Sequence, residues 1–96
     1  MASLVWLESA TEDTENIFDF LAQSSPAMAT TKLKTIHDAV DILKHAPKLG
    51  HPATLGRREL LIGKHHGGYV AVYRYDPITD TVFVLEIRSQ RQLPSS

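Results

Sequence analysis

The sequence predicts an α+β fold with the element order β-α-α-β-β-β, in which an antiparallel sheet packs against an N-terminal helical hairpin. Two patterns lead to this prediction. In the second half of the chain, three segments alternate apolar and polar residues and are separated by short polar turns, which is typical of an antiparallel meander. In the first half, apolar residues recur every three or four positions, which is typical of helices that bury one face.

The elements of the first half can be placed from their end signals. Ser3 to Leu7 is an apolar segment that we expect to form the first strand and to pair with an edge of the later sheet. The first helix is expected to begin after Ser9, whose hydroxyl would accept a backbone N–H while Glu12 reaches back as in a capping box. Ser25 and Pro26 then indicate a stop and a restart, with Pro26 at the first position of the second helix.

The second helix is expected to run to about His45. Its apolar residues step by four, three, four and three positions, so they form one stripe that faces a partner. They are Ala29, Leu33, Ile36, Val40 and Leu43.

The three strands of the meander are expected at Arg58 to Gly63, Gly68 to Tyr75 and Thr81 to Arg88. Residues 48–56 are rich in Gly and Pro and predict an irregular loop before the first of them. Because side chains on a strand alternate between faces, Tyr69, Tyr73 and Tyr75 should all lie on one face.

Length and composition limit the class of protein. The chain has 96 residues, of which 43% are hydrophobic, enough for a single domain spanning residues 1–96. It has no cysteine, which excludes disulfides, cysteine-ligated zinc and a thiol nucleophile and favours a reducing cytoplasm. No segment approaches the roughly 20 apolar residues that span a bilayer. His37, His45 and His51 show no metal-binding spacing, and His65 and His66, which could ligate metal, are expected in a solvated turn, so we expect no metal and no cofactor.

Charge is divided unevenly along the chain. Residues 1–43 contain two lysines and seven carboxylates, a net charge of −5, whereas residues 44–96 contain eight basic and four acidic residues, a net charge of +4. The half that carries the meander is therefore the basic half. This permits contact with nucleic acid or with an acidic protein but requires neither.

The order and spacing of these features resemble the RelE/ParE superfamily of toxins from type II toxin–antitoxin modules, and its ParE branch most closely. The resemblance covers nearly the whole chain. It rests on Trp6, Ile17 to Leu21, the Ser25–Pro26 junction, Pro47 with Gly50, Arg58-Glu59-Leu60, Tyr69-Val70, Tyr73-Arg74 and Ile87 to Arg91.

The resemblance implies a toxin that arrests bacterial growth and is neutralised by a cognate antitoxin, whose C-terminal segment wraps across the helical hairpin and the sheet. ParE-like members poison DNA gyrase and have no accepted hydrolytic site, whereas RelE-like members cut mRNA on the ribosome. RelE-like cleavage needs a base, an acid and cations around the phosphate. RelE-like toxins place an arginine after the tyrosine that opens the middle strand, where this chain has Val70.

Two further departures point away from RNA cleavage. The preceding strand reads Glu59-Leu60-Leu61-Ile62 where RelE-like toxins carry basic residues, and the tail from Arg91 to Ser96 has neither Tyr nor His. Inhibition of DNA gyrase is therefore the favoured function, with no catalytic residues assigned. A ribosome-dependent mRNA endonuclease and an inactive interaction domain that keeps the toxin fold remain open as alternatives.

Four arginines are the candidate target contacts. Arg88 and Arg91 follow the apolar part of the last strand and are least needed for packing. Arg58 has the alternative of pairing with a carboxylate on a neighbouring strand. Arg74 has the alternatives of a position at the partly exposed edge of a buried face or of a pair with Glu86.

Apolar residues outside the helical stripe are the candidate antitoxin contacts. Phe20, Met28 and Ile42 would form a patch that needs a partner, and Tyr73 would belong either to the core or to the antitoxin groove. Because exposed apolar patches favour association, we expect a homodimer or a toxin–antitoxin hetero-oligomer.

Overall fold

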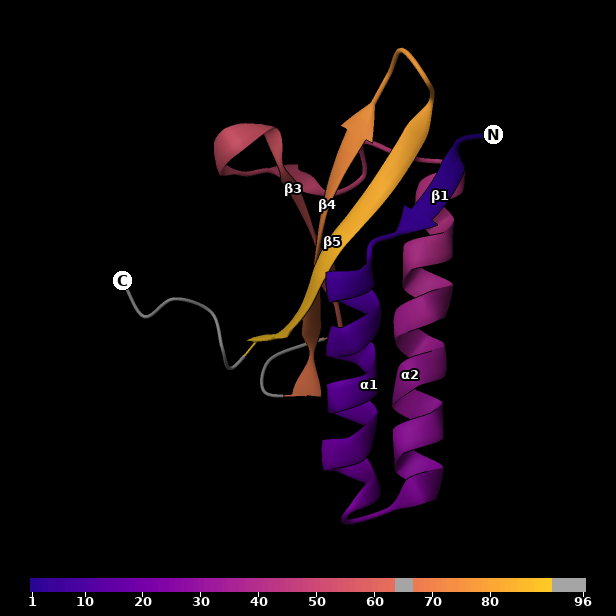
Figure 1. Ribbon diagram of the computed structural model, residues 1–96, viewed down its shortest axis with the longest axis vertical. Helices are drawn as coiled ribbons and strands as arrows, with labels where there is room; N and C mark the ends of the chain where they lie inside the picture. The colour runs from indigo at the N-terminus through magenta and orange to yellow at the C-terminus, as the bar shows by residue number, and fades with distance from the viewer. Residues whose placement is uncertain (64–66, 91–96) are drawn as a thin grey trace.

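Two helices lie on one side of a twisted sheet in the computed structural model, which describes residues 1–63 and 67–90 (Figure 1). The helices are α1 (Glu8–Ala22) and α2 (Pro26–Asp41), and the long strands are β3 (Arg58–Ile62), β4 (Tyr69–Asp76) and β5 (Thr81–Ser89). The short elements are β1 (Ser3–Trp6), a 3₁₀ turn η1 (Ile42–Lys44), β2 (His51–Pro52) and a 3₁₀ turn η2 (Thr54–Gly56).

The sheet has the strand order β1-β5-β4-β3-β2. The predicted α+β class and the order of the main elements are confirmed, but the sheet is mixed rather than wholly antiparallel. β1 runs parallel to β5, with Ser3 opposite Thr81 and Trp6 opposite Val84. Directly after β1, Leu7 donates its N–H to the Val84 carbonyl at 3.0 Å, and the chain continues into α1, which packs against β5.

The start of α1 differs from the prediction. The helix begins at Glu8, one residue after the extended Leu7, and no side chain caps it. Ser9 therefore lies inside the helix, so the predicted capping box with Glu12 does not form. The Ser9 hydroxyl instead donates to the Leu85 carbonyl at 2.7 Å, and an Asp13 carboxylate oxygen accepts the Ile87 N–H at 3.0 Å. Both bonds tie α1 to β5.

The start of α2 agrees with the prediction. Pro26 occupies the first turn, and the Ser25 hydroxyl accepts the Met28 N–H at 3.1 Å, satisfying one of the free donors at the helix end. The helix passes into the 3₁₀ turn Ile42–Lys44, close to the predicted end at His45.

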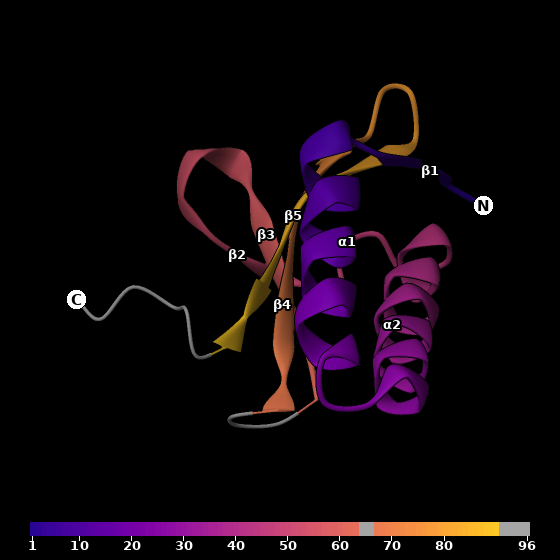
Figure 2. The same ribbon diagram turned by 60° about the horizontal axis from the view of Figure 1, so that its bottom comes forward.

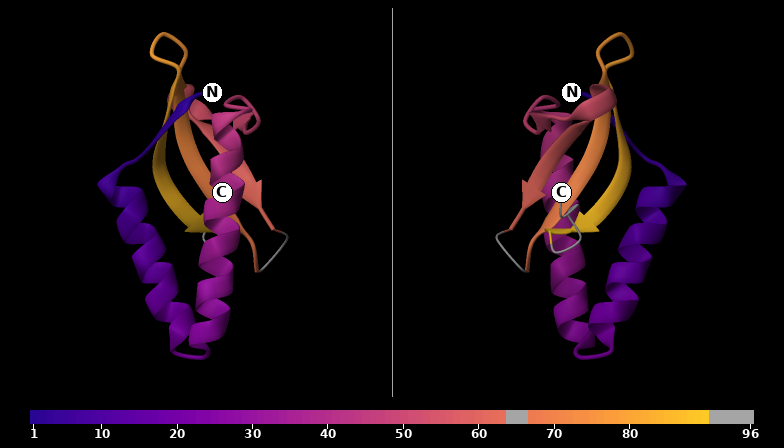
Figure 3. Two further views of the ribbon diagram at one scale, coloured as in Figure 1. Left: turned by 90° about the vertical axis from the view of Figure 1, so that its right-hand side faces the viewer. Right: turned by 90° about the vertical axis from the view of Figure 1, so that its left-hand side faces the viewer.

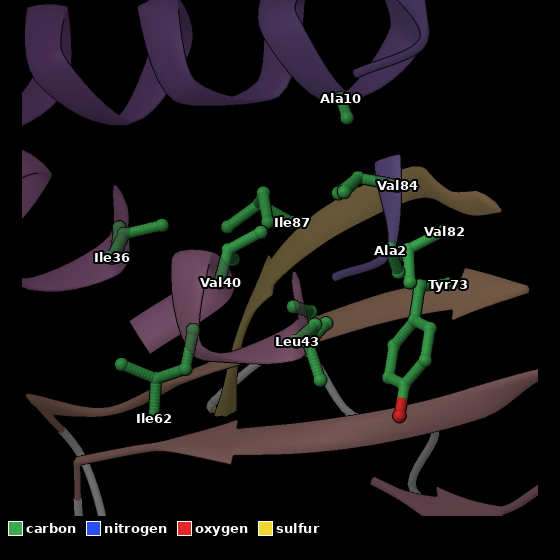
Figure 4. Packing of buried hydrophobic residues seen from close by; sticks show 11 residues of the cluster. Ala2, Ala10, Ile36, Val40, Leu43, Ile62, Tyr73, Val82, Val84 and Ile87 are labelled. Atoms are coloured by element: carbon green, nitrogen blue, oxygen red, sulfur yellow. The ribbon is translucent and has the colours of Figure 1, made fainter. Parts of the chain in front are cut away.

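The core lies between the helices and one face of the sheet. Ile36, Val40 and Leu43 are fully buried, which confirms the stripe on α2, and Figure 4 shows them beside Ile62 of β3 and Ile87 of β5. The three tyrosines of β4 share this face, as predicted: Tyr73 belongs to the core cluster, and Tyr69 and Tyr75 pack against it.

The segment before β3 is more ordered than the predicted irregular loop. His51 and Pro52 pair with Glu59 and Arg58, and the tight turn Thr54–Gly56 joins the two strands. The same segment is held from below by Tyr73, whose hydroxyl accepts the Gly50 N–H at 2.8 Å and donates to the Pro47 carbonyl at 2.8 Å.

The helical hairpin is longer than the sheet that it covers. The two helices converge at their connecting loop and separate toward their other ends, and the converging end extends past the start of β4 (Figure 3). The last turn of α1 and the first turn of α2 are thus left without a strand beneath them. Within residues 1–63 and 67–90, no helix is long and apolar enough to cross a membrane.

Candidate functional site: the open face of the sheet and the hairpin groove

The first candidate site is the face of the sheet that the helices leave uncovered, which we call the open face. Side chains that alternate with the core residues point to it, and strand register places Glu59 beside Val72 and Leu61 beside Val70. On the other side of β4, Glu86 lies beside Val72 and Arg88 beside Val70. Figure 2 shows both helices on one side of the sheet and the β2–β3 turn projecting on the other.

Arginines and carboxylates interleave across the open face. Glu59 accepts a hydrogen bond from Arg88 at 3.1 Å (Nη2 to Oε2) and lies 3.3 Å from His51 Nε2. Glu86 lies between two guanidinium groups, 3.9 Å from Arg57 Nη1 and 3.9 Å from Arg88 Nε. The cationic side chains of this face are thus largely matched by carboxylates.

Arg74 is the exception. It is exposed on the open face, where register sets it opposite Phe83. The predicted pair with Glu86 is not formed, because Glu86 lies between Arg57 and Arg88 instead. Among the described residues, no carboxylate pairs with Arg74, so it is a free cation at the surface.

Arg58 lies on the opposite face from Arg74 and Arg88, since it pairs in register with the core residue Tyr73. Its guanidinium donates to the Gly50 carbonyl at 2.7 Å and to the Lys48 carbonyl at 3.3 Å, so it holds the loop before β2. The predicted alternative, in which Arg58 pairs with a carboxylate on a neighbouring strand, is wrong, because the guanidinium bonds to backbone carbonyl groups instead. Because both guanidinium bonds go to this loop, Arg58 is a structural residue.

The structure thus brings two of the four predicted target contacts, Arg74 and Arg88, onto one face. Arg91 lies outside the described residues. The sequence analysis missed the carboxylates that hold the arginines. Glu59 follows Arg57 by two positions, and Glu86 precedes Arg88 by two. Opposite charges at this spacing lie on one face of a strand, and β3 and β5 flank β4, so this spacing was the signal for the network.

The second candidate site is a groove of about 680 Å³ at the converging end of the helices, which we call the hairpin groove. It lies between α1, α2, the start of β4 and the end of β5, where the hairpin extends beyond the sheet. Its lining residues are Asp13, Asn16, Ile17, Phe20, Leu21, Met28, Lys32, Gly67, Tyr69, Ile87 and Ser89.

Two of the four predicted antitoxin contacts line this groove. Phe20 is 71% exposed and Met28 is 41% exposed, so both offer apolar surface to a partner. Ile42 is 50% exposed but follows the end of α2, about 20 Å of helix from Met28 at 1.5 Å per residue. Tyr73 is fully buried, and its hydroxyl already accepts a hydrogen bond from Gly50 and donates one to Pro47. Its assignment as an antitoxin contact was wrong, because a core tyrosine has no surface to offer.

The hydroxyls of Tyr73 and Tyr75, which lie on the helix-covered face, are neutral at physiological pH. Burial raises the pKa of Tyr73, against the opposing effects of the Gly50 hydrogen bond and the Arg58 charge. The hydrogen bond to the Asp80 carboxylate, at 2.7 Å, raises the pKa of Tyr75. Within residues 1–63 and 67–90, no three His, Asp or Glu side chains gather as a metal site would require.

Residues 4–94 match the model of the ParE toxin family of type II toxin–antitoxin systems, parDE. The chain therefore belongs to this family of the RelE/ParE toxin superfamily, and the predicted resemblance is confirmed.

Relatives with names from both branches of the superfamily are similar to the chain. Toxin RelE2 from Caulobacter vibrioides is 31% identical over 93 residues, which are 97% of this chain and 100% of the relative. The chromosomal ParDE system of P. aeruginosa contains a chain with a TM-score of 0.79 and 24% identity, covering 93% of this chain and 96% of that one. The RelBE2 toxin–antitoxin complex from Mycobacterium tuberculosis has a TM-score of 0.61 and 16% identity, with coverages of 93% and 98%. Both structural likenesses support the fold.

Proposed function

We propose that this toxin arrests bacterial growth by inhibiting DNA gyrase in the cytoplasm, and that a cognate antitoxin neutralises it by binding the hairpin groove. Membership of the ParE toxin family supports the first part. The presence of toxin–antitoxin complexes among the structural neighbours supports the second.

The observation that favours gyrase over RNA cleavage is the environment of Val70. This residue is fully buried on the open face, at the position where RelE-like toxins carry an arginine. Its neighbour in register is Arg88, whose guanidinium is bound by the Glu59 carboxylate. The Glu59 carboxylate repels phosphate and already pairs with Arg88, the cation beside Val70. Among the residues that the structure describes, no free cation is therefore available beside Val70 to stabilise a charged phosphorane.

The hydroxyls of Tyr73 and Tyr75 are also poorly placed for acid–base chemistry. The Tyr73 hydroxyl is held in the core by Gly50 and Pro47, and the Tyr75 hydroxyl donates to Asp80. Both pKa values are raised, which moves the phenols away from the near-neutral range of an effective general base.

Ribosome-dependent mRNA cleavage is the second candidate, favoured by the 31% identity to a relative named Toxin RelE2. The two functions separate in purified systems. With purified gyrase, ATP and supercoiled plasmid, the proposal predicts protein-dependent linear DNA after detergent and protease treatment. In a reconstituted translation reaction with ready-made mRNA, it predicts normal peptide yield and no new RNA ends by primer extension. New codon-positioned RNA ends without linear DNA would replace the proposal by the second candidate.

The hairpin groove fits an apolar segment that also carries positive charge. Phe20 and Met28 offer apolar contacts, the charged residues of the lining are Asp13 and Lys32, and Glu15 and Asp19 are exposed on α1 near the groove. A complementary segment would bury the apolar side chains and place Lys or Arg against α1. The antitoxin encoded with the toxin is the expected source of such a segment.

A substitution at Ile42 tests how far along α2 the antitoxin contact extends. If the segment follows α2 beyond the groove, Ile42→Ser weakens the complex; if it ends in the groove, only Phe20→Ser and Met28→Ser do so. Binding of the purified antitoxin to each variant, followed by calorimetry, checks this. Unchanged affinity in all three variants would contradict docking in the hairpin groove.

A further inference from the structure

The turn between β2 and β3 has an unusual residue at its tip. Arg57 donates its N–H to the Thr54 carbonyl at 3.2 Å, and the two residues between them have positive φ: Leu55 with φ 59° and ψ 34°, and Gly56 with φ 73°. Two successive positive φ values are the geometry of a type I′ hairpin turn, which prefers Asn-Gly or Asp-Gly. Gly56 satisfies this preference and Leu55 does not.

Neither local conformation nor packing accounts for a leucine at this position. The left-handed region is unfavourable for a bulky side chain because Cβ approaches the following carbonyl. The Leu55 side chain is 75% exposed, so it gains little from burial in return. Strained backbone that packing does not explain is typical of sites where a side chain is needed for function.

Asp80 provides the contrast. It is the other non-glycine residue with positive φ in the described part of the chain, at 49°. Aspartate is among the residues that tolerate this conformation, and its carboxylate accepts the Tyr75 hydroxyl at 2.7 Å. The Asp80 conformation is thus explained within the fold, whereas that of Leu55 is not.

The free cation of the open face lies beside this turn. A Cβ added to Gly56 would stand 3.3 Å from Arg74 Nη1, so the guanidinium passes over the turn. Arg74 is exposed and unpaired among the described residues, unlike Arg57 and Arg88. One projecting structure therefore presents an exposed apolar side chain and an uncompensated positive charge side by side.

We propose that Leu55 and Arg74 form a contact site for a protein partner, with Leu55 entering an apolar pocket and Arg74 pairing with a carboxylate at its rim. This deepens the proposed function and rests on it, because the partner is the target that the toxin inhibits. The site lies on the other side of the sheet from the hairpin groove (Figure 2), so the antitoxin docked in the groove does not occupy it.

A protein partner fits this surface better than a nucleic acid. Binding along phosphates needs several uncompensated cations, and the neighbouring Arg57 and Arg88 are matched by Glu86 and Glu59. Arginine is enriched at the hot spots of protein interfaces, and an exposed apolar side chain such as Leu55 gains stabilisation when a partner's pocket removes it from water.

Leu55→Asn tests the proposal sharply, because it removes the apolar contact while supplying the residue that the turn prefers. We expect its urea unfolding midpoint to equal or exceed that of the unsubstituted protein, and its concentration for half-maximal gyrase-dependent linear DNA to rise at least tenfold. The matched control is Ile78→Asn, which removes an apolar side chain that is 93% exposed in the turn between β4 and β5. This control should leave the concentration unchanged.

The role of Arg74 is tested by comparing Arg74→Gln with a control substitution of a cation on α2. Arg74→Gln should weaken inhibition at least tenfold, whereas Lys34→Gln, which removes an exposed charge paired with Asp38, should not. Full potency of both Leu55→Asn and Arg74→Gln would overturn the proposal. So would tight, salt-sensitive binding of the toxin to plasmid DNA without gyrase that Arg74→Gln abolishes, because the contact would then be to phosphate.

Failure of the proposed target is distinguishable from failure of this site. Growth arrest on induction in cells reports toxicity whatever the target is. If the unsubstituted protein arrests growth without gyrase-linked DNA breaks, gyrase is the wrong target, and loss of arrest in Leu55→Asn with retention in Ile78→Asn still supports the site. Equal arrest by the unsubstituted protein and by Leu55→Asn overturns the site.

Discussion

The two faces of the sheet differ in how their side chains are satisfied. On the helix-covered face, apolar side chains fill the core and the polar groups there are bonded inside the protein, as the Tyr73 hydroxyl is to Gly50 and Pro47. On the open face, Arg88 pairs with Glu59 at 3.1 Å, Arg74 is free within the described region, and the adjoining turn carries a strained, exposed Leu55.

This difference separates the residues that stabilise the protein from those available to a partner. A buried and fully bonded side chain such as Tyr73 can be changed only at the expense of the fold. An exposed side chain such as Leu55 or Arg74 contributes little to folding, so its identity is set by something else. Three substitutions and one pH profile test this separation, in order of decreasing effect on stability.

The largest loss of stability is expected for Ile36→Ala, because Ile36 is fully buried between α2 and the sheet. Removing its side chain leaves a cavity and should lower the free energy of unfolding by about 2–5 kcal/mol. Leu61→Ala on the open face is the control: Leu61 is 56% exposed, and the change should be about 0.5 kcal/mol or less. Urea denaturation of both variants checks this, and equal losses would contradict the comparison.

Tyr73→Phe should have a smaller but clear effect. The substitution keeps the ring in the core and leaves the buried Gly50 N–H without its acceptor, which should cost about 1–3 kcal/mol. A loss similar to that of Tyr75→Phe, which removes only an exposed hydrogen bond to Asp80, would show that the hydrogen bonds from Tyr73 to residues 47–50 are not needed for stability.

The same residue gives a pH dependence with a defined sign. Burial raises the pKa of Tyr73 above its ordinary value of 10.0, so the folded state favours the protonated phenol. Its contribution is fully present below pH 10.0 and is lost as pH rises through the higher folded-state pKa. We expect the unfolding midpoint to fall above that pH and to fall less in Tyr73→Phe. Identical alkaline profiles would argue against a buried hydroxyl.

Glu59→Gln on the open face should change stability less than Ile36→Ala or Tyr73→Phe. The Glu59 and Arg88 side chains are partly exposed, and pairs of this kind contribute roughly 0.2–1 kcal/mol. The substitution also leaves Arg88 without its carboxylate partner, so the variant should bind polyanions such as heparin more tightly than the unsubstituted protein at low salt. An unfolding free energy reduced as much as in Ile36→Ala would mean that the open face is part of the stable core.

Periodicity was sufficient to predict the helix-covered face. The stripe from Ala29 to Leu43, the turn at Pro26 and the alternation of Tyr69, Tyr73 and Tyr75 are local patterns that burial enforces. The parallel pairing of β1 with β5 was not accessible in this way, because it depends on how α1 packs. Ser9 was misassigned for the same reason: its hydroxyl bonds to Leu85, 76 positions away, in preference to the local cap.

Sequence reasoning was weaker for the candidate site. It proposed Arg74 and Arg88, which the structure places on the open face, and Phe20 and Met28, which line the hairpin groove; their roles as contacts stay predictions. It did not resolve which arginine is bound by a carboxylate or which face Arg58 occupies, because these depend on strand register. Leu55 was predicted only as part of an irregular loop, because a positive φ cannot be predicted from the sequence when the residue is not Gly, Asn or Asp.

The most direct test of the account compares one variant from each surface, Phe20→Ser in the hairpin groove and Leu55→Asn beside the open face. Each is induced in cells with and without the antitoxin, and growth arrest is recorded. The account predicts that Phe20→Ser arrests growth even when the antitoxin is present, and that Leu55→Asn accumulates as a folded protein that binds the antitoxin but does not arrest growth. The reverse pattern, or loss of toxicity in both variants while both remain folded, would contradict the separation of target binding from neutralisation.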